Sequence, residues 1–200
     1  MFDLTLFQSS CLAITIVVLG GLAGCASKGA DVTVAASDGT VCAPLTGEPG
    51  DVVVLLFASP DCPIANAIAP EIERLHLSAA ESGGRFYLVQ ARSDVTAEQA
   101  ITHAKKYGIT SPVLLDTNHL LTTSMHATVT PEIVVLRFGD DGQPVTVYQG
   151  LVNNLYASLG NRRDRATEHY GRDAIVAAVT GQAVEPSYRK PLGCFLEQTR

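Results

Sequence analysis

Residues 51–70 read DVVVLLFASPDCPIANAIAP, and this stretch decides the fold class. After its first residue the chain is apolar without interruption as far as residue 58, which is typical of a β-strand buried on both faces. Cys62 follows this strand, and apolar residues then recur at helical spacing. The pattern predicts a strand over 51–58 and a helix over 63–80 that is kinked at Pro70.

The rest of the chain predicts alternating strands and helices that end in an antiparallel hairpin. Thr96 and Gln99 have the spacing of a capping box for a helix over 97–107, which Gly108 ends. The order β-α-β-α-β-α-β-β-α predicts an α/β fold with a mixed sheet and helices on both faces. The other predicted strands are 86–91, 113–115, 128–138 and 145–149, and the other helices are 118–126 and 167–180.

The last predicted helix closes the globular part of the chain. We expect Ile175, Val176 and Val179 to face the core from this helix. No internal repeat is visible. The predicted organisation is a signal peptide at 1–24, a tether at 25–40, a domain at 41–180, and a C-terminal tail at 181–200 that contains Cys194.

The composition narrows the classes of function. The 200 residues are 46% hydrophobic and 17% charged, which excludes a disordered chain. A net charge of −6 without a basic run offers no electrostatic footprint for nucleic acid. No glycine-rich phosphate loop is present and the histidines lack metal-ligand spacing, so we expect no cofactor and no metal. We expect His76 and His103 to lie at the surface.

The N-terminus has features of an export signal. The apolar run 12–23 is too short to span a bilayer comfortably but suits the core of a signal peptide. It leads into Leu-Ala-Gly-Cys at Cys25, which resembles a bacterial lipobox and implies a diacylated Cys25. Residues 1–11 contain no Lys or Arg, unlike the positive start of most signals. We expect a lipid-anchored, extracytoplasmic protein of the bacterial cell envelope; the alternatives are an ordinary cleaved signal or an N-terminal anchor.

Cys62 lies where a thiol is reactive. It follows a strand and begins a helix, so unpaired backbone N–H groups and the positive end of the helix dipole favour the thiolate. The neighbouring Asp61 acts in the opposite direction, because a carboxylate disfavours a second negative charge. We expect Cys62 to be an accessible nucleophile, and the alternative is a buried structural thiol.

Two prolines extend the pattern around Cys62. Pro70 follows it by eight residues in CPIANAIAP, and Thr130-Pro131 stands at the entry of the strand before the hairpin. These features resemble the thioredoxin-like superfamily over residues 40–180, and the Gly-Cys tail is similar to that of redoxin or AhpC/TSA-type envelope proteins. The resemblance implies a thioredoxin-like three-layer α/β/α sandwich and thiol redox chemistry. It also implies that Thr130 and a cis Pro131 lie against the sulfur of Cys62.

The thioredoxin motif lacks its second cysteine here, because Ala65 occupies that position. A nucleophilic Cys62 therefore needs another thiol to release it from a mixed disulfide or a sulfenic acid. Cys194 is the first candidate and Cys42 the second, and the alternative is a structural Cys42–Cys194 bridge that leaves Cys62 alone. The expected partners are protein or small-molecule disulfides or peroxides, together with an external thiol reductant.

Two other functions stay open. A peroxiredoxin-like peroxidase has Ser or Thr three residues before its cysteine, as Ser59 is here, but Leu55 replaces its usual proline. Its activating arginine has no secure counterpart, and the eligible residues are Arg137, Arg162 and Arg163. The other alternative is a catalytically silent thioredoxin-like fold that serves as a binding module.

A cluster of charge at residues 161–165, NRRDR, follows the predicted hairpin. A solvated loop with internal charge pairing is the simpler interpretation of this run. The functional interpretation is that the run attracts an acidic partner, or a substrate carboxylate, near Cys62.

Overall fold

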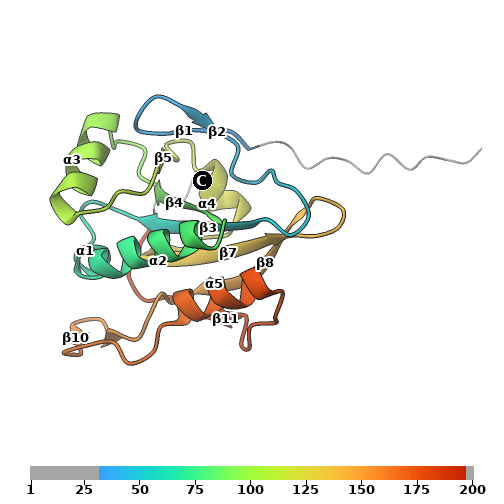
Figure 1. Ribbon diagram of the computed structural model, residues 1–200. Coiled ribbons are helices and arrows are strands. Elements are labelled where there is room, and N and C mark those ends of the chain that lie inside the picture. Colours follow the sequence, from blue (N-terminus) through green and yellow to red (C-terminus); the bar gives the residue numbers. More distant parts are fainter. Residues whose placement is uncertain (1–31, 197–200) are drawn as a thin grey trace, which may run out of the picture.

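The computed structural model describes residues 32–196 (Figure 1). The predicted signal peptide, the lipidation residue Cys25 and the first part of the predicted tether lie outside the described residues. Over residues 32–196, no helix has the length and apolar character needed to cross a membrane.

A six-stranded mixed sheet forms the centre of the molecule. Its strands are β3 (Val52–Ala58), β4 (Arg85–Gln90), β5 (Val113–Leu115), β7 (Glu132–Phe138), β8 (Pro144–Gly150) and β11 (Tyr188–Arg189). They lie in the order β11-β8-β7-β3-β4-β5. The strands β3, β4 and β5 are parallel, whereas β7 is antiparallel to both of its neighbours, β3 and β8. The predicted mixed sheet is confirmed.

The strand β3 occupies the middle of this sheet, between β7 and β4, and is buried along its whole length. Its side chains alternate between two core clusters, with Val54 and Leu56 in one and Val53 and Leu55 in the other. Because both faces of the strand are covered, it needs apolar residues at every position, which explains the uninterrupted run in the sequence.

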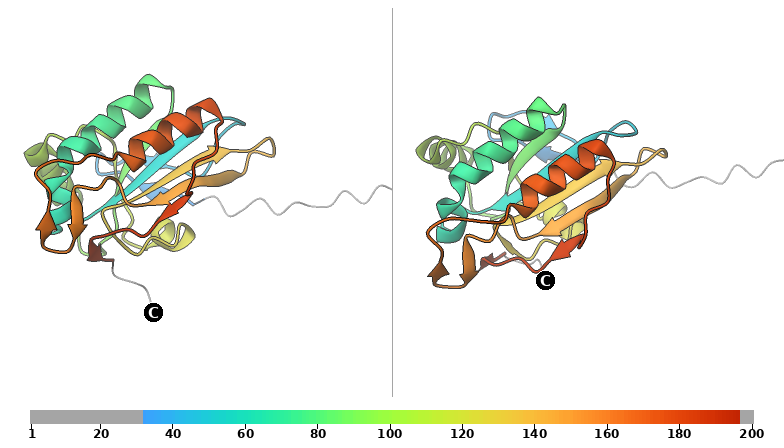
Figure 2. Two further views of the ribbon diagram at one scale, coloured as in Figure 1. Left: turned by 90° about the horizontal axis from the view of Figure 1, so that it is seen from below. Right: turned by 60° about the horizontal axis from the view of Figure 1, so that its bottom comes forward.

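Helices cover both faces of the sheet, as predicted. The helices α2 (Ala69–Glu81), α3 (Ala97–Tyr107) and α5 (Tyr170–Thr180) bury residues in the same cluster as Val54, and we call this side the first face. The helix α4 (Leu120–Ser124) and the hairpin at residues 34–42, which includes the end of the predicted tether, pack on the second face. Figure 2 shows α2 and α5 side by side along the first face. The three-layer α/β/α sandwich is therefore confirmed.

The predicted helix over 63–80 is divided into two, α1 (Pro63–Ala67) and α2. Pro70 has no N–H and its ring crowds the preceding turn. The helical ladder breaks at Ile68, whose N–H is shared between the carbonyls of Ile64 and Ala65, each at 3.2 Å. The predicted kink is confirmed.

The helix α3 begins and ends as predicted. The side chain of Thr96 accepts the N–H of Gln99 at 3.2 Å, and the Gln99 side chain accepts the N–H of Thr96 at 2.8 Å. Gly108 follows the helix in the left-handed conformation, with φ 67°. The capping box and the glycine stop are both confirmed.

The buried side of α5 differs from the prediction. Val176 and Val179 are 53% and 37% exposed, so their expected inward orientation is wrong. The helix lies so close to the sheet that a Cβ on Gly171 would meet the side chain of Ile133 at 3.0 Å. Small residues therefore suit the contact better than the larger valines. The buried residues of the helix are Gly171, Ala174, Ile175 and Ala178.

The chain after residue 150 is more structured than its sequence indicates. Strands β9 (Tyr156–Ser158) and β10 (Asn161–Arg162) form a hairpin, and β11 joins the central sheet parallel to β8. Further on, β12 (Cys194–Phe195) pairs antiparallel with β6 (Val129–Thr130). The predicted tail at 181–200 thus contributes two strands to the fold.

Candidate functional site

Cys62 lies where β3 ends and α1 begins. It is the N-cap residue of α1, with φ −82° and ψ 109°, and its sulfur accepts a hydrogen bond from the N–H of Ala65 at 3.5 Å. The turn that leads to it is closed by a bond of 3.1 Å from the Cys62 N–H to the carbonyl of Ser59. Ala65, which replaces the second motif cysteine, therefore still contributes a backbone donor to the sulfur.

Thr130 and Pro131 lie against this sulfur. Their peptide bond is cis, as the resemblance implies, and it joins β6 to β7. The Cys62 thiol donates to the carbonyl of Thr130 at 2.9 Å. Because β7 pairs with β3 throughout its length, the sheet itself holds this junction beside the start of α1.

Cys194 reaches the same place from the C-terminal segment. In the pairing of β12 with β6, Cys194 is the partner of Thr130, and its side chain lies close enough to Cys62 for each thiol to shift the pKa of the other. The preceding residue, Gly193, passes so close that a Cβ on it would lie 2.0 Å from the carbonyl oxygen of Thr130. Only glycine fits this crossing. Gly193 is therefore required for steric reasons, and the residue after it, Cys194, brings its thiol to Cys62.

The pKa values of the two thiols shift in opposite directions. Burial raises the pKa of Cys62, but the neighbouring Cys194 thiol, the Ala65 N–H and the Thr130 side chain together lower it by more, so this pKa lies below its ordinary value. The bond that Cys62 donates to the Thr130 carbonyl favours the protonated thiol and only weakens this effect. Burial, and then the neighbouring Cys62, raise the pKa of Cys194 to about 11. Of the two thiols, Cys62 is therefore the one that ionises more readily, and Cys194 stays protonated.

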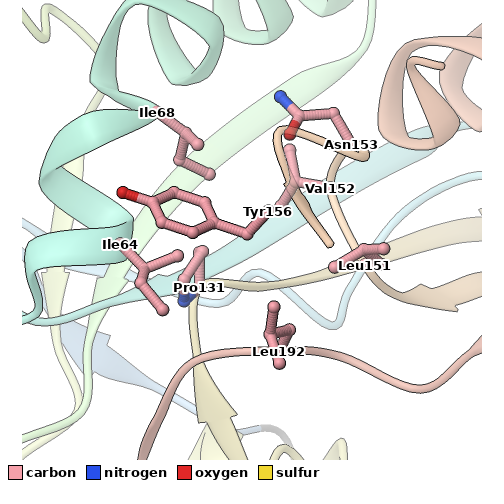
Figure 3. Close-up of a pocket in the computed structure, with 8 residues that line it drawn as sticks. All are labelled: Ile64, Ile68, Pro131, Leu151, Val152, Asn153, Tyr156 and Leu192. Atoms are coloured by element: carbon pink, nitrogen blue, oxygen red, sulfur yellow. The ribbon is translucent and has the colours of Figure 1, made fainter. Parts of the chain in front are cut away.

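The expected accessibility of Cys62 is wrong for this conformation, because the residue is only 1% exposed. The strand β12 covers it on one side, and Leu192 of the same segment lines a small cavity together with Pro131 and Ile64 (Figure 3). The cavity measures about 10 Å³, which is hardly enough for one water molecule. Access to Cys62 from solvent therefore requires the C-terminal segment to move.

Cys42 lies apart from the other two cysteines. It is half-buried on β2 (Val41–Cys42) and packs against the core cluster of the second face, whereas Cys62 and Cys194 belong to the cluster of the first face. All three thiols are free in this structure. The fold thus brings Cys194, and not Cys42, to Cys62.

A hydrogen-bonded chain that the sequence did not reveal supports the turn before Cys62. The Asn66 side chain donates to the carbonyl of Pro60 at 2.8 Å and accepts from Nε2 of His103 at 2.7 Å. His103 is only 8% exposed, so its predicted surface position is wrong, and His76 is half-buried. Burial, and then the nearby Lys106, lower the pKa of His103. A neutral His103 with its proton on Nε2 is the form that fits this bond.

Glu132 has a similar role on the opposite side of Cys62. It is 1% exposed, and one carboxylate oxygen accepts the N–H groups of Thr128 and Val129 at 2.8 and 3.4 Å. Its other oxygen accepts from the side chain of Gln149 at 2.7 Å. These bonds fix the loop that carries Thr130. The sequence signal is the acidic residue directly after the proline, at the start of a mainly apolar strand.

The neighbours of Asp61 and the eligible arginines bear on the electrostatics of the site. Asp61 forms an ion pair with Arg92, which offsets the negative charge next to Cys62. Arg137 pairs with Val52, at the opposite end of β3 from Cys62, and donates to the carbonyl of Ala178 at 2.7 Å. Arg137 therefore cannot activate a peroxide at Cys62.

No group of three or more metal-ligating side chains occurs among residues 32–196. The described site consists of two sulfurs, backbone carbonyl and N–H groups, and apolar side chains around them. Such a donor set supports thiol chemistry directly.

The comparisons with known proteins agree with the topology described above. No family model and no curated protein matches this chain. Among solved structures, a hypothetical protein from Sinorhizobium meliloti 1021 is 22% identical over 85% of this chain and 92% of its own, with a TM-score of 0.69. An uncharacterized conserved protein from Geobacillus kaustophilus is 21% identical over 84% and 88%, with a TM-score of 0.64. MTB dsbF, solved in mixed oxidized and reduced forms, is 19% identical over 76% and 94%, with a TM-score of 0.50. The chain has a thioredoxin-like fold.

Proposed function

We propose that this chain is a thiol-disulfide oxidoreductase of the redoxin type, with Cys62 as the nucleophile and Cys194 as the resolving thiol. The observation that carries the proposal is the contact of the two sulfurs beside the cis Pro131, with their pKa values shifted apart. A nucleophile needs the lower pKa, and a thiol that acts second needs to stay protonated until it is required.

The proposed reaction has two exchanges. The Cys62 thiolate attacks one sulfur of a substrate disulfide, the substrate S–S bond breaks, and one half leaves as a thiolate. Cys194 then loses its proton and attacks the Cys62 sulfur, so the mixed disulfide breaks and the second half leaves. Two electrons pass from the two cysteines to the substrate, and an external thiol reductant returns them.

The state of Cys62 controls the second exchange. Cys62 contributes to the raised pKa of Cys194 through its hydrogen bond and its charge. Once Cys62 is part of a neutral mixed disulfide, its negative charge is gone and the pKa of Cys194 falls. The resolving thiol is therefore activated by the first exchange.

The mobility of the C-terminal segment is part of this proposal. Substrate reaches Cys62 only when β12 separates from β6, which are strands of two residues each. Strands this short separate at a small free-energy cost compared with the central sheet. The burial of Cys62 also favours a second candidate function, a catalytically silent binding module, if the segment never opens.

Disulfide mapping by mass spectrometry tests the proposal. The reduced protein is oxidised with a small disulfide or with hydrogen peroxide, and the cysteine links are identified before and after. We expect a Cys62–Cys194 link in the wild type, a trapped mixed disulfide at Cys62 in Cys194→Ser, and no reaction in Cys62→Ser. The control Cys42→Ser reacts like the wild type. A Cys62 that resists both oxidants in the folded protein contradicts the proposal and supports the silent module, whereas oxidation by peroxide alone supports the peroxidase.

The location of the protein is a separate proposal. We propose that it is exported and lipid-anchored at Cys25 in the bacterial cell envelope, supported by the lipobox-like sequence before that residue. Labelling of cells with an alkyne fatty acid tests it. The wild type incorporates the label and sediments with membranes, and Cys25→Ser does neither.

A further inference from the structure

A second cavity lies next to the Cys62 site and has a different character. It measures about 260 Å³ and lies between α1, α2 and the segment that carries β9 and β10. Its floor is apolar, and its cations come from α2 and from the segment after β9: Arg74, Arg162 and Arg165. We call it the cationic pocket. Its volume approaches the lower end of the range of small-molecule sites, roughly 300 Å³.

The charges of the cationic pocket do not cancel. Glu71 is its only carboxylate, and its side chain is 7% exposed. One Glu71 oxygen binds Arg74 at 2.7 Å and the other binds Nδ1 of His169 at 3.1 Å. Arg162 and Arg165 have no ion-pair partner within residues 32–196, in a chain whose net charge is −6. Two guanidinium groups therefore remain available to an anion.

A buried amide adds a directed donor. Asn153 is 6% exposed, and its Oδ1 accepts the N–H of Leu155 at 3.0 Å, which fixes the other atom of the amide as the nitrogen. No hydrogen bond from this nitrogen to residues 32–196 is formed, and the nitrogen is not shut off from solvent. The amide is therefore held in place by its oxygen, while its nitrogen is available as a donor to water or to a ligand.

The cationic pocket shares two lining residues with the small cavity beside Pro131. Asn153 and Ile68 line both the cationic pocket and the small cavity that contains Pro131 and Leu192 (Figure 3). Ile68 lies six residues after Cys62, a rise of about 9 Å along a helix. A fully extended tripeptide spans about 10 Å. A small peptide whose sulfur lies at Cys62 can thus place a terminal group in the cationic pocket.

We propose that the cationic pocket binds a carboxylate of the thiol or disulfide that exchanges with Cys62, so that the preferred partner is a small anionic peptide thiol or its disulfide. The inference rests on the proposed function and names its substrate class. Arg162 and Arg165 supply the attraction, and the Asn153 amide fixes one carboxylate oxygen. The NRRDR run is then part of a binding site for the partner.

Competing disulfides test the substrate class. Reduced protein is oxidised with glutathione disulfide, which is anionic, and with cystamine, which is cationic, and the second-order rate constant of each reaction is measured. In Arg162→Glu/Arg165→Glu we expect the rate constant for glutathione disulfide to fall about tenfold or more, with no fall for cystamine. The matched control Lys105→Glu/Arg172→Glu has the same change of charge on α3 and α5 and leaves the ratio unchanged. An unchanged ratio in the arginine variant overturns the inference.

Binding without exchange separates this inference from the proposed function. In Cys62→Ser/Cys194→Ser, reduced glutathione is titrated and the Asn153 side-chain amide is followed by NMR. A shift of this amide that is lost in Arg162→Glu/Arg165→Glu supports the pocket even if the wild type fails to react with either disulfide, a failure that contradicts only the proposed function. Absence of any shift overturns the pocket. Inorganic phosphate that binds as tightly as glutathione also overturns the assignment to carboxylates.

Discussion

Cys62 and Cys194 meet at one point, but the two regions that carry them are held in different ways. Cys62 follows a strand in the middle of the sheet and is fixed by the turn, by α1 and by Asn66. Cys194 lies on a two-residue strand that pairs, within the described part of the chain, with the equally short β6 alone. In the proposed function, this difference places the nucleophile on a part held by the central sheet, and its cover and partner sulfur on a segment that only a short strand pairing holds.

The largest effect is expected from removing the close crossing at Gly193. In Gly193→Ala the new Cβ would lie 2.0 Å from the Thr130 carbonyl oxygen, so β12 cannot stay paired. The rate of Cys62 alkylation by iodoacetamide should rise about 100-fold, since a tenfold change corresponds to about 1.4 kcal/mol and the closed state is worth a few kcal/mol.

The neighbouring variant Phe195→Ala is the control for this change, because Phe195 is 89% exposed and its removal leaves the pairing intact. It should be alkylated at the wild-type rate. Equal rates in Gly193→Ala and the wild type would show that the C-terminal segment does not limit access to Cys62.

A second cysteine on α1, next to Cys62, tests whether Cys194 is needed. The N–H of Ala65 is 3.5 Å from the Cys62 sulfur, so Ala65→Cys should form a disulfide within the motif and leave Cys194 reduced. Ala65 is 2% exposed, and the larger side chain should lower the free energy of unfolding by about 1–3 kcal/mol. Peptide mapping of the oxidised protein gives the ratio of the two links. Ala67→Cys, two residues further along the helix, should leave the Cys62–Cys194 link dominant.

The pH dependence of stability should differ between the two thiols. The lowered pKa of Cys62 stabilises the fold above the unfolded pKa of about 8.5, and this contribution is lost as pH falls through the folded value. The raised pKa of Cys194 acts in the other direction, so its contribution is present below the unfolded pKa and is lost as pH rises toward about 11. Urea unfolding at a series of pH values should therefore show that Cys194→Ala loses less stability than the wild type between pH 9 and 11. The opposite order would contradict the assignment of the two shifts.

The smallest effect is expected from removing Asn66, which supports the turn before Cys62. Asn66→Ala leaves the Pro60 carbonyl and the Nε2–H of His103 without a partner, which should cost about 1–3 kcal/mol of unfolding free energy. The rate of Cys62 oxidation should fall with it, because the turn before Cys62 loses its support. The exposed Thr102→Ala on the adjacent helix should change neither quantity by a measurable amount.

The contrast between the region of Cys62 and the region of Cys194 also explains which features the sequence predicts correctly. The strand over 51–58, the helix break near Pro70 and the caps of α3 follow from local patterns of apolar residues, proline and glycine, and the structure agrees with them. The strand pairings of residues 188–196 have no such pattern, because strands of two residues have no periodicity to detect. The burial of Cys62 depends on these pairings, so the sequence does not predict it.

Features that depend on distant neighbours were also missed. His103, which donates to Asn66, and Gln149, which donates to Glu132, lie far away in the chain and on other elements. The wrong orientation of Val176 and Val179 has the same origin, because the close approach at Gly171 depends on the opposing sheet. A sequence pattern records spacing along one element and not what that element faces.

The strand β11 has a consequence for the kinetics of resolution. It is fixed in the sheet beside β8, and Gly150 is required there, since a Cβ would meet the Arg189 carbonyl oxygen at 1.7 Å. Cys194 is the fifth residue after Arg189, so the chain between them spans at most about 18 Å. In the proposed reaction, the resolving sulfur therefore stays within this radius when β12 separates from β6, at an effective concentration in the millimolar range. The mixed disulfide is then intercepted by its own chain before thiols in solution reach it.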